Sequence, residues 1–144
     1  MDRIKQLKPN LYTADMSRGK IVIAPSPDFS CHFIVNAKEN AEFIRSQAKE
    51  LLLSGCKHFD FYGAKAGLWH KYFDETDVKY RTGDVALTRI WESLEHFVEN
   101  LAFDIMNSKD RPSDGILGKK FYILFDDSRV CREVVERLRD WCGA

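Results

Sequence analysis

The sequence lacks an excess of either charge. Its 144 residues carry 22 basic and 22 acidic side chains, which cancel. A protein that binds nucleic acid by charge alone carries a basic excess, so the composition argues against a nucleic-acid partner. A cluster of basic residues near the N-terminus still indicates a locally basic surface there: Lys5, Lys8, Arg18 and Lys20.

Long apolar runs are also missing. A helix needs roughly 20 consecutive apolar residues to span a bilayer, and no stretch of the sequence approaches that length. Residues 1–5 lack the apolar centre of a signal peptide. We therefore expect a protein that does not enter a membrane and that stays in the cytoplasm.

Motifs for catalysis and phosphate binding are absent as well. The sequence contains neither a glycine-rich phosphate loop nor the Gly-x-Ser-x-Gly turn of a nucleophilic serine. We expect no cofactor, and the sequence leaves open whether the protein is an enzyme. The cysteines form no Cys-x-x-Cys pair, which predicts reduced and mostly buried thiols: Cys31, Cys56, Cys131 and Cys142.

Two groups of residues carry metal-ligand chemistry, and neither predicts a bound metal. Residues 31–32 and 56–58 supply the Cys and His ligands that zinc prefers, but neighbouring side chains on a strand point to opposite faces. Asp126 and Asp127 offer carboxylates to Mg²⁺, with Asp60 as a third if the strands are neighbours. Against this, Asp60 lies in mid-strand, and one of the adjacent aspartates is expected to cap a helix.

What the sequence does contain is a repeated strand-then-helix pattern. Three short runs rich in aromatic and β-branched residues, at 31–35, 57–62 and 120–125, each lead into apolar residues at helical spacing. Three such units predict a parallel sheet with helices packed on it. We expect residues 1–144 to form one three-layer α/β domain of Rossmann-like type. Its sheet is predicted to be mostly parallel, with four to five strands and helices on both faces.

The N-terminal part is expected to add an antiparallel strand. Residues 1–19 are mixed and polar, with a turn at Pro9-Asn10. Residues 20–24 are predicted to form a strand that Pro25 ends, because proline cannot donate to a sheet. Since the loop to Cys31 is short, this strand is expected to lie antiparallel beside the next one.

Helix positions follow from apolar spacing and capping residues. Residues 36–39 have capping-box spacing ahead of a helix over 41–52. A short helix over 64–73 is followed by a loop with an extended piece at 78–81. From Asp84 to Ile105, apolar residues step by three and four, which predicts the longest helix with Leu94 buried in its middle. A loop is expected over 107–118, and Asp127 or Ser128 is expected to cap the final helix.

The carboxyl ends of the strands are the predicted ligand site. Ligands of open α/β sheets settle there, and helix N-termini at the same edge favour an anion. We call this edge the carboxyl-end rim. The alternative is that its Asn, Asp and Ser residues serve only as helix caps. The predicted ligand-binding residues are Asn36, Lys38, Tyr62, Gly63, Lys65, Asp126, Asp127, Ser128 and Arg129.

A second predicted surface is the aromatic segment at 61–80. We expect Trp69 to be partly exposed and to contact a protein partner together with His70 and Tyr72, because aromatic anchors inside a polar rim are typical of interfaces. The competing interpretation is that Trp69 packs under the long helix.

Two function classes remain from the sequence. The first is a non-enzymatic protein-binding module, such as an immunity or antitoxin-like inhibitor or a regulatory subunit, with a protein partner or a second copy of itself. The alternative is a small enzyme or sensor that binds a nucleotide or another anion at the carboxyl-end rim. The absence of catalytic motifs favours the first.

Overall fold

The computed structural model describes residues 3–26, 28–81, 83, 85–108 and 119–142. Its centre is a six-stranded sheet in the order β1-β2-β6-β3-β4-β5, in which only β1 and β2 are antiparallel. The strands are β1 (Ile4–Lys8), β2 (Leu11–Asp15), β3 (Phe29–Ile34), β4 (His58–Tyr62), β5 (Leu87–Trp91) and β6 (Lys120–Phe125). The helices are α1 (Ala41–Leu53), α2 (Ala66–Tyr80), α3 (Leu94–Asn107) and α4 (Ser128–Cys142).

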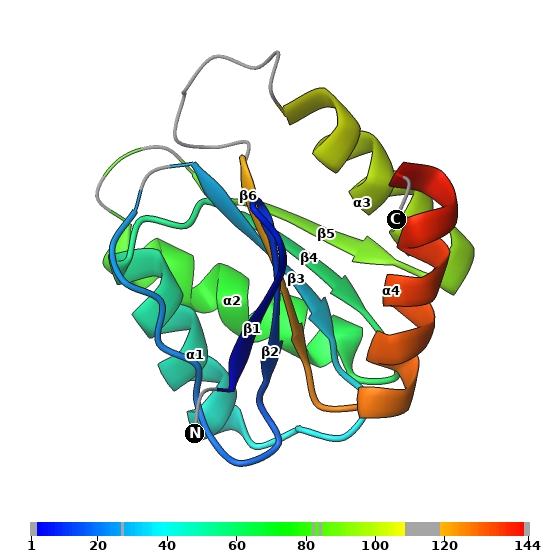
Figure 1. The fold of residues 1–144 in the computed structure, drawn as a ribbon. Helices are drawn as coiled ribbons and strands as arrows, with labels where there is room; N and C mark the ends of the chain where they lie inside the picture. Colours follow the sequence, from blue (N-terminus) through cyan, green and yellow to red (C-terminus); the bar gives the residue numbers. More distant parts are fainter. Residues whose placement is uncertain (1–2, 27, 82, 84, 109–118, 143–144) are drawn as a thin grey trace.

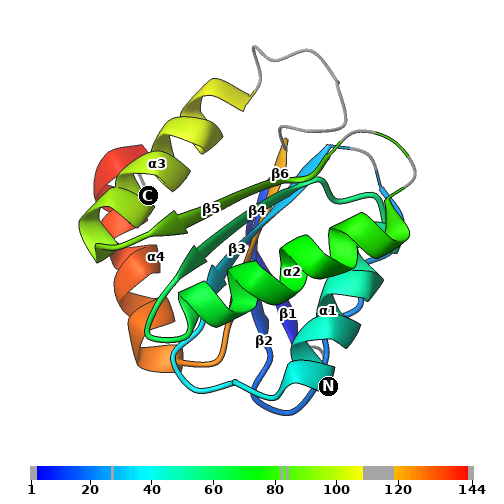
Figure 2. The same cartoon turned by 180° about the vertical axis from the view of Figure 1, so that it is seen from behind.

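The helices cover both faces of the sheet. Figures 1 and 2 show α1 and α2 on one face and α3 and α4 on the other. The three-layer α/β architecture and the mostly parallel sheet are thus confirmed, with one strand more than the largest expected number. None of the described helices is long and apolar enough to cross a membrane.

The face under α1 and α2 holds an aromatic core. Phe33 of β3 and the two phenylalanines of β4, Phe59 and Phe61, project from this face. They contact Phe73 of α2 at ring-centroid distances of 4.9–5.2 Å, and Trp69 lies 5.2 Å from Phe33. All five side chains are buried. Because aromatic side chains bury the most apolar area, this cluster fixes α2 against the sheet.

The face under α3 and α4 is apolar mainly at its centre. Phe121 and Ile123 of β6 form a buried cluster with Phe97 and Leu101 of α3 and Val134 of α4. On either side of this centre, the same face carries polar side chains. One polar group lies toward β5, and the other lies toward β1. These two groups are the candidates for function.

The antiparallel N-terminal strand lies elsewhere than predicted. The turn at Pro9-Asn10 joins β1 and β2, and β1 is the antiparallel strand at the edge. Residues 20–24 are not a strand, so that prediction is wrong. Both sides of β3 are occupied by β4 and β6. The backbone N–H and C=O of Ile21 instead bond to the side-chain amide of Gln47, each at 2.8 Å.

The predicted long helix from residue 84 to 105 is also wrong, because Leu87–Trp91 forms β5. Its residues pair with β4 in parallel register, and β-branched residues such as Thr88 suit that position. Ser93 then caps α3 by accepting the His96 N–H at 3.1 Å. Leu94 is therefore the first helical residue and is only half-buried, not a mid-helix core residue.

Two helix boundaries differ from the predictions. α1 is capped by Asn40, whose side chain accepts a backbone N–H of the first turn at 3.0 Å, and not by Asn36. α2 continues to Tyr80, so the extended piece expected at 78–81 is wrong. Packing against α1 accompanies this extension, since Lys49 of α1 lies 4.9 Å from the centre of the Tyr80 ring.

Two predictions fall partly outside the described residues. Asn107 is the last residue of α3, and residues 109–118 of the expected loop are not among the described residues. Three cysteines, Cys31, Cys56 and Cys131, are buried free thiols as predicted, whereas the Cys142 side chain lies outside the described set.

Candidate functional site

The centre of the carboxyl-end rim is filled by a carboxylate of the chain itself. Asp126 follows β6 and accepts the backbone N–H groups of Asn36, Ala37 and Lys38 at 2.8, 3.0 and 2.7 Å. These groups follow β3, where the strand order reverses and where an anionic ligand would bind. Because Asp126 already accepts all three N–H groups, they are not free for a ligand.

The loops after β3 and β4 are joined to each other at the same rim. Asn36 accepts the Ala64 N–H at 2.8 Å and donates to Asp127 at 2.9 Å. Gly63 has a φ of +126°, and a Cβ there would stand 2.5 Å from the carbonyl oxygen of Val35. Only glycine fits this position, so its role is in packing. A small cavity of about 330 Å³ remains beside Gly63.

Three further rim residues have partners within the chain. Lys65 forms an ion pair with Glu39 at 2.7 Å. The Lys38 ammonium lies 4.6 Å over an aromatic ring of α1. Tyr62 stacks on Phe97 of α3 with ring centroids 5.5 Å apart. Each of these three side chains therefore contacts another part of the chain, not an open ligand site.

The residues after β6 divide into a cap and two surface positions. Asp127 caps α4, as predicted, by accepting the Val130 N–H at 3.1 Å. Arg129 is exposed. Ser128 lines a large cavity described below. The structure thus leaves one of the nine predicted rim residues beside a large open space.

Trp69 is buried, so the expectation that it is partly exposed is wrong. Its ring contacts Phe33 and Phe73, and its Nε1 donates to the Lys38 carbonyl at 2.8 Å. The helical phase of α2 turns Trp69 toward the sheet, and the hydrogen bond satisfies its only polar atom. This residue is therefore part of the core.

The other two residues of the predicted partner surface are partly exposed. His70 lies 3.1 Å from the Thr88 hydroxyl and 3.4 Å from Asp74. Tyr72 lies under the Arg45 guanidinium, 4.6 Å from ring centre to Cζ. Without Trp69, Tyr72 is the only large aromatic residue of the predicted set on this surface.

A buried polar network lies under α3, on the β5 side of the apolar centre. Ser30 Oγ lies 2.8 Å from His32 Nε2, and His32 Nδ1 lies 2.9 Å from an oxygen of Asp60. This order of groups is that of a Ser-His-Asp proton relay. All three side chains are at most 1% exposed, so no substrate reaches them in this structure.

Arg89 completes this buried network from β5. It donates to both oxygens of Asp60 at 2.8 and 3.1 Å, to Asp104 at 3.4 Å and to His58 Nε2 at 2.7 Å. Because a guanidinium only donates, His58 Nε2 is the acceptor. The proton of a neutral His58 is then on Nδ1, a buried atom without a hydrogen-bond partner among the described residues.

The pKa values in this network have opposing causes. Burial raises the pKa of Asp60, but hydrogen bonding from His32 and the further interactions with His58 together outweigh it and hold the pKa well below the ordinary value. Burial lowers the pKa of His32, and the neighbouring Asp60 offsets only part of this effect. At neutral pH the network therefore holds an ionised Asp60 beside a neutral His32.

The network has metal-ligand geometry but already contains a cation. His58, Asp60 and Asp104 each place a ligand atom within 4.8 Å of the others. Arg89 donates to all three, so its guanidinium supplies the positive charge of the cluster. Because Asp60 belongs to this network, the structure does not bring it to Asp126 in a shared magnesium site.

The cysteines and histidines of residues 31–32 and 56–58 point to opposite faces of the sheet, as expected from strand alternation. Cys31 and Cys56 lie in the core under α1 and α2, with their sulfur atoms 3.7 Å apart. His32 and His58 lie in the network on the opposite face. The four side chains are therefore divided between the two faces of the sheet.

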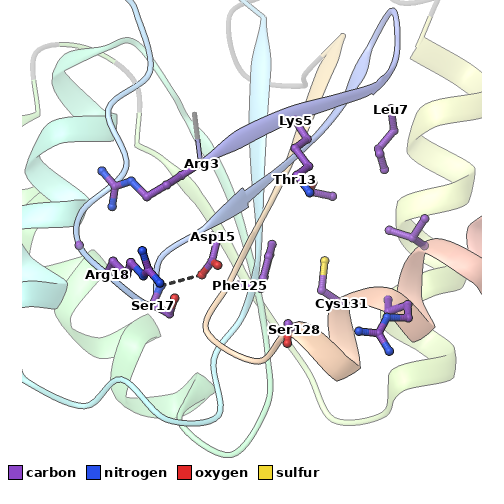
Figure 3. A pocket seen from close by; sticks show the side chains of 13 residues that line it. Arg3, Lys5, Leu7, Thr13, Asp15, Ser17, Arg18, Phe125, Ser128 and Cys131 are labelled. Atoms are coloured by element: carbon purple, nitrogen blue, oxygen red, sulfur yellow. Dashed lines mark hydrogen bonds between the residues drawn. The ribbon is translucent and has the colours of Figure 1, made fainter. Parts of the chain in front are cut away.

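A cavity of about 820 Å³ lies on the β1 side of the apolar centre, between the β1–β2 hairpin and α4 (Figure 3). We call it the basic cavity. Among the described residues that line it, four are cationic, namely Arg3, Lys5, Arg18 and Arg132, and Asp15 is the only carboxylate. The remaining described residues that line it are Leu7, Thr13, Ser17, Gly19, Phe125, Ser128, Cys131 and Val135.

Strand alternation directs the β1 residues into the basic cavity. Ile4 packs into the core under α1 and α2, so Lys5 projects from the opposite face. Leu7 also lines the cavity, and so does Arg3, whose guanidinium donates to the Lys20 carbonyl at 2.8 Å. On β2, Thr13 stands beside Lys5 in the antiparallel register. The apolar cluster under α3 and α4 reaches Leu11 of β2 but contains no described residue of β1 (Figures 1 and 2).

The titratable groups of the basic cavity are not tuned for acid–base or nucleophilic chemistry. Burial raises the pKa of Asp15, but hydrogen bonds from Ser17 and the charges of Arg18 and Arg3 outweigh it, so the pKa is lowered. Burial and the nearby Asp15 charge raise the pKa of Cys131 to about 12. The carboxylate is therefore ionised and the thiol protonated at neutral pH, and no histidine stands among the described lining residues.

Part of the basic cavity can be recognised from the sequence. Lys5 and Arg18 belong to the basic N-terminal cluster recognised in the sequence, whereas Arg3 and Arg132 were not singled out. The signal for Arg132 was its position one helical turn after Ser128, on the same side of α4. The position of Arg132 points to the cavity only if β1 is known to lie near α4. That placement follows from the β1–β2 hairpin, which the sequence does not predict.

Comparison with known proteins gives no match: no family model, no curated protein and no solved structure is similar to this chain.

Proposed function

We propose that the protein is a non-enzymatic binding protein, of sensor or regulatory type, that holds a small anionic ligand in the basic cavity. The observation that carries this proposal is the charge of the cavity lining. Four cations face one carboxylate, in a chain whose total charge is zero. The volume of about 820 Å³ falls in the range of roughly 300–1,000 Å³ that is typical of small-molecule sites.

The arrangement of these charges supports an anion as the ligand. Asp15 accepts a backbone N–H from Ser17 at 2.8 Å and balances one positive charge at most. The remaining like charges repel each other across the cavity, and an anion relieves that repulsion. Arginine also presents a planar fork of donors that suits phosphate and carboxylate groups. A ligand with two or three negative charges would neutralise the cavity.

The protonation states of the titratable groups in the basic cavity support binding without catalysis. Cys131 is held as a thiol and Asp15 as a carboxylate with bonds of its own. The Ser-His-Asp relay is buried on the other side of the apolar centre. No described side chain at the basic cavity is therefore placed to act as nucleophile or general base.

Isothermal titration calorimetry tests this proposal. Inorganic phosphate, AMP, ATP and citrate are titrated at low ionic strength into the wild type and into Arg18→Gln and Arg132→Gln. We expect at least one of these anions to bind one-to-one with a Kd below about 1 mM, and each variant to weaken it by about tenfold.

Arg137→Gln is the matched control. Arg137 is also on α4, but it is exposed and pairs with Glu133 at 3.3 Å, away from the cavity lining. It should leave binding unchanged, while raising the salt concentration should weaken binding in the wild type. No binding by any of the four anions, or equal losses in all three variants, would contradict the proposal.

A protein partner is the second candidate, as an inhibitor or regulatory module of the immunity or antitoxin type. The observation that favours it is the position of β1 as an edge strand beside the basic cavity. An extended acidic segment of a partner would pair with this edge and place side chains beside Arg3 and Lys5. Binding of an acidic peptide, but of none of the small anions, would favour this candidate.

A further inference from the structure

We infer that the ligand of the basic cavity is an amphipathic anion, with a phosphate-like or carboxylate group at one end and an aliphatic group at the other. This inference rests on the proposed function and adds the chemical class of the ligand. Its basis is that the charged lining residues occupy one end and the middle of the cavity, whereas Leu7 and Val135 occupy the other end.

The strand register sets the direction of that length. Asp15 donates its backbone N–H to the Arg3 carbonyl at 3.1 Å and stands beside Phe125 of β6. Arg3, Asp15 and Phe125 therefore form one cross-strand row at the carboxyl ends of β2 and β6. Ser17 and Arg18 stand two and three residues after Asp15, so this end of the cavity is charged (Figure 3).

The opposite end of the cavity is aliphatic. Leu7 lies four residues beyond Arg3 on β1, a distance of about 13 Å along a strand. Val135 lies seven residues beyond Ser128 on α4, about 10 Å along a helix. Figure 3 shows Leu7 on the far side of the cavity from Arg18 and Ser17. Both ends are described lining residues of one continuous space.

Leu7 exposes an aliphatic side chain to the basic cavity. Its side chain is 41% exposed, and Lys5, two residues earlier on β1, is charged. A single exposed leucine is common on protein surfaces. This one faces a cavity whose far wall offers Val135, so an aliphatic group in the cavity would bury both. A simple inorganic anion would leave this end of the cavity unused.

The test compares inorganic phosphate with hexyl phosphate by titration calorimetry. The two probes share the anionic group and differ in the alkyl chain. We expect hexyl phosphate to bind at least about tenfold more tightly, the gain expected from burying about two methylene groups. Hexanol, which lacks the anion, should not bind measurably.

Two leucine variants locate the alkyl chain. Leu7→Ser should abolish most of the hexyl phosphate advantage and leave the phosphate affinity unchanged. Leu53→Ser is the control, because Leu53 is an exposed leucine of α1 outside the cavity lining, and it should keep the full advantage. Both substitutions are at exposed positions, so the fold should persist.

The outcomes separate the two proposals. Equal affinities for phosphate and hexyl phosphate, or an advantage that survives Leu7→Ser, would overturn the amphipathic ligand and leave the anion site standing. Absence of binding by either phosphate would overturn the anion site and this inference with it.

Discussion

On the face of the sheet under α3 and α4, two polar groups lie on either side of an apolar centre. Toward β5, Arg89 joins Asp60 and Asp104 in a network with buried carboxylates. Toward β1, Arg3 and Arg132 face an open cavity with one carboxylate between four cations. Both groups contain arginine, and both extend from the sheet to a helix. They differ in whether the chain supplies the opposite charge.

That difference separates a structural role from a binding role. A buried charge costs several kcal/mol unless it is paired and hydrogen-bonded, so the network can exist only with its partners in place. Cations beside water carry no such requirement and can turn to a ligand, although Arg3 already donates one N–H to the Lys20 carbonyl at 2.8 Å. The buried network should therefore control the stability of the protein, and the basic cavity should control its binding.

Asp60→Asn should show the largest effect on stability. It removes the carboxylate that Arg89 and His32 share, and breaking a buried pair costs about 3–5 kcal/mol. Urea denaturation followed by circular dichroism gives the free energy of unfolding. Glu133→Gln removes an exposed carboxylate of α4 and should cost less than about 0.5 kcal/mol. A loss for Asp60→Asn as small as that of the control would mean that the network is not structural.

Trp69→Ala measures the stability contribution of the aromatic core on the other face of the sheet, for comparison with Asp60→Asn. Because Trp69 is fully buried, its truncation should cost about 3–5 kcal/mol. Trp141 of α4 is 51% exposed, and Trp141→Ala should stay within about 0.5 kcal/mol. Similar losses in Trp69→Ala and Asp60→Asn would show that the polar network stabilises the fold as strongly as the aromatic core. Near-identical melting curves for the two tryptophan variants would show that Trp69 is not part of the core.

Acidic pH should act on the buried network before it acts on the basic cavity. The pKa of His32 is lowered in the folded protein, so the unfolded chain binds more protons as pH falls below about 6.5. Asp60 extends this loss to lower pH, because its folded pKa is well below its ordinary value. The free energy of unfolding should therefore decrease from pH 7.5 to pH 5.

His32→Asn should flatten that pH dependence, and His96→Asn, at an exposed position of α3, should leave it unchanged. Urea midpoints measured across this pH range provide the check. A pH dependence of the same slope in the His32 variant would assign the effect to other groups.

The smallest stability effect is expected in the basic cavity. Arg18→Gln and Arg132→Gln should change the free energy of unfolding by no more than about 0.5 kcal/mol, since both side chains are exposed. A small gain in stability is expected at low salt, because each change removes repulsion between like charges. A large loss in either variant would place that arginine in the structural group.

The sequence predicted the layers of the fold and missed its N-terminal edge. Residues 120–125 matched β6 because a buried strand and its flanking cap are both local signals. β1 was not predicted, since its sequence Ile-Lys-Gln-Leu-Lys is mostly polar and its pairing with β2 is the deciding contact. The apolar spacing of β5 continues into α3 and predicts one helix, and only the pairing of β5 with β4 distinguishes the strand from the helix.

The candidate sites show the same limit. Asn36 and Asp126 were placed at the carboxyl-end rim, but that they bond to each other there depends on β6 lying beside β3. The network around Arg89 was not predicted at all, because it depends on β5 and on the pitch of α3 over the sheet. Contacts between distant segments therefore decide which polar residues are bonded within the chain and which are exposed to a ligand.

The most direct test of the difference between the two regions is an amide chemical-shift titration of ¹⁵N-labelled protein with hexyl phosphate. We predict saturable shifts of the amide signals of Thr13, Ser17 and Cys131 in the basic cavity, and unchanged amide signals of His32 and His58 in the buried network. Shifts confined to the network, or no saturable shift at the cavity, would contradict it.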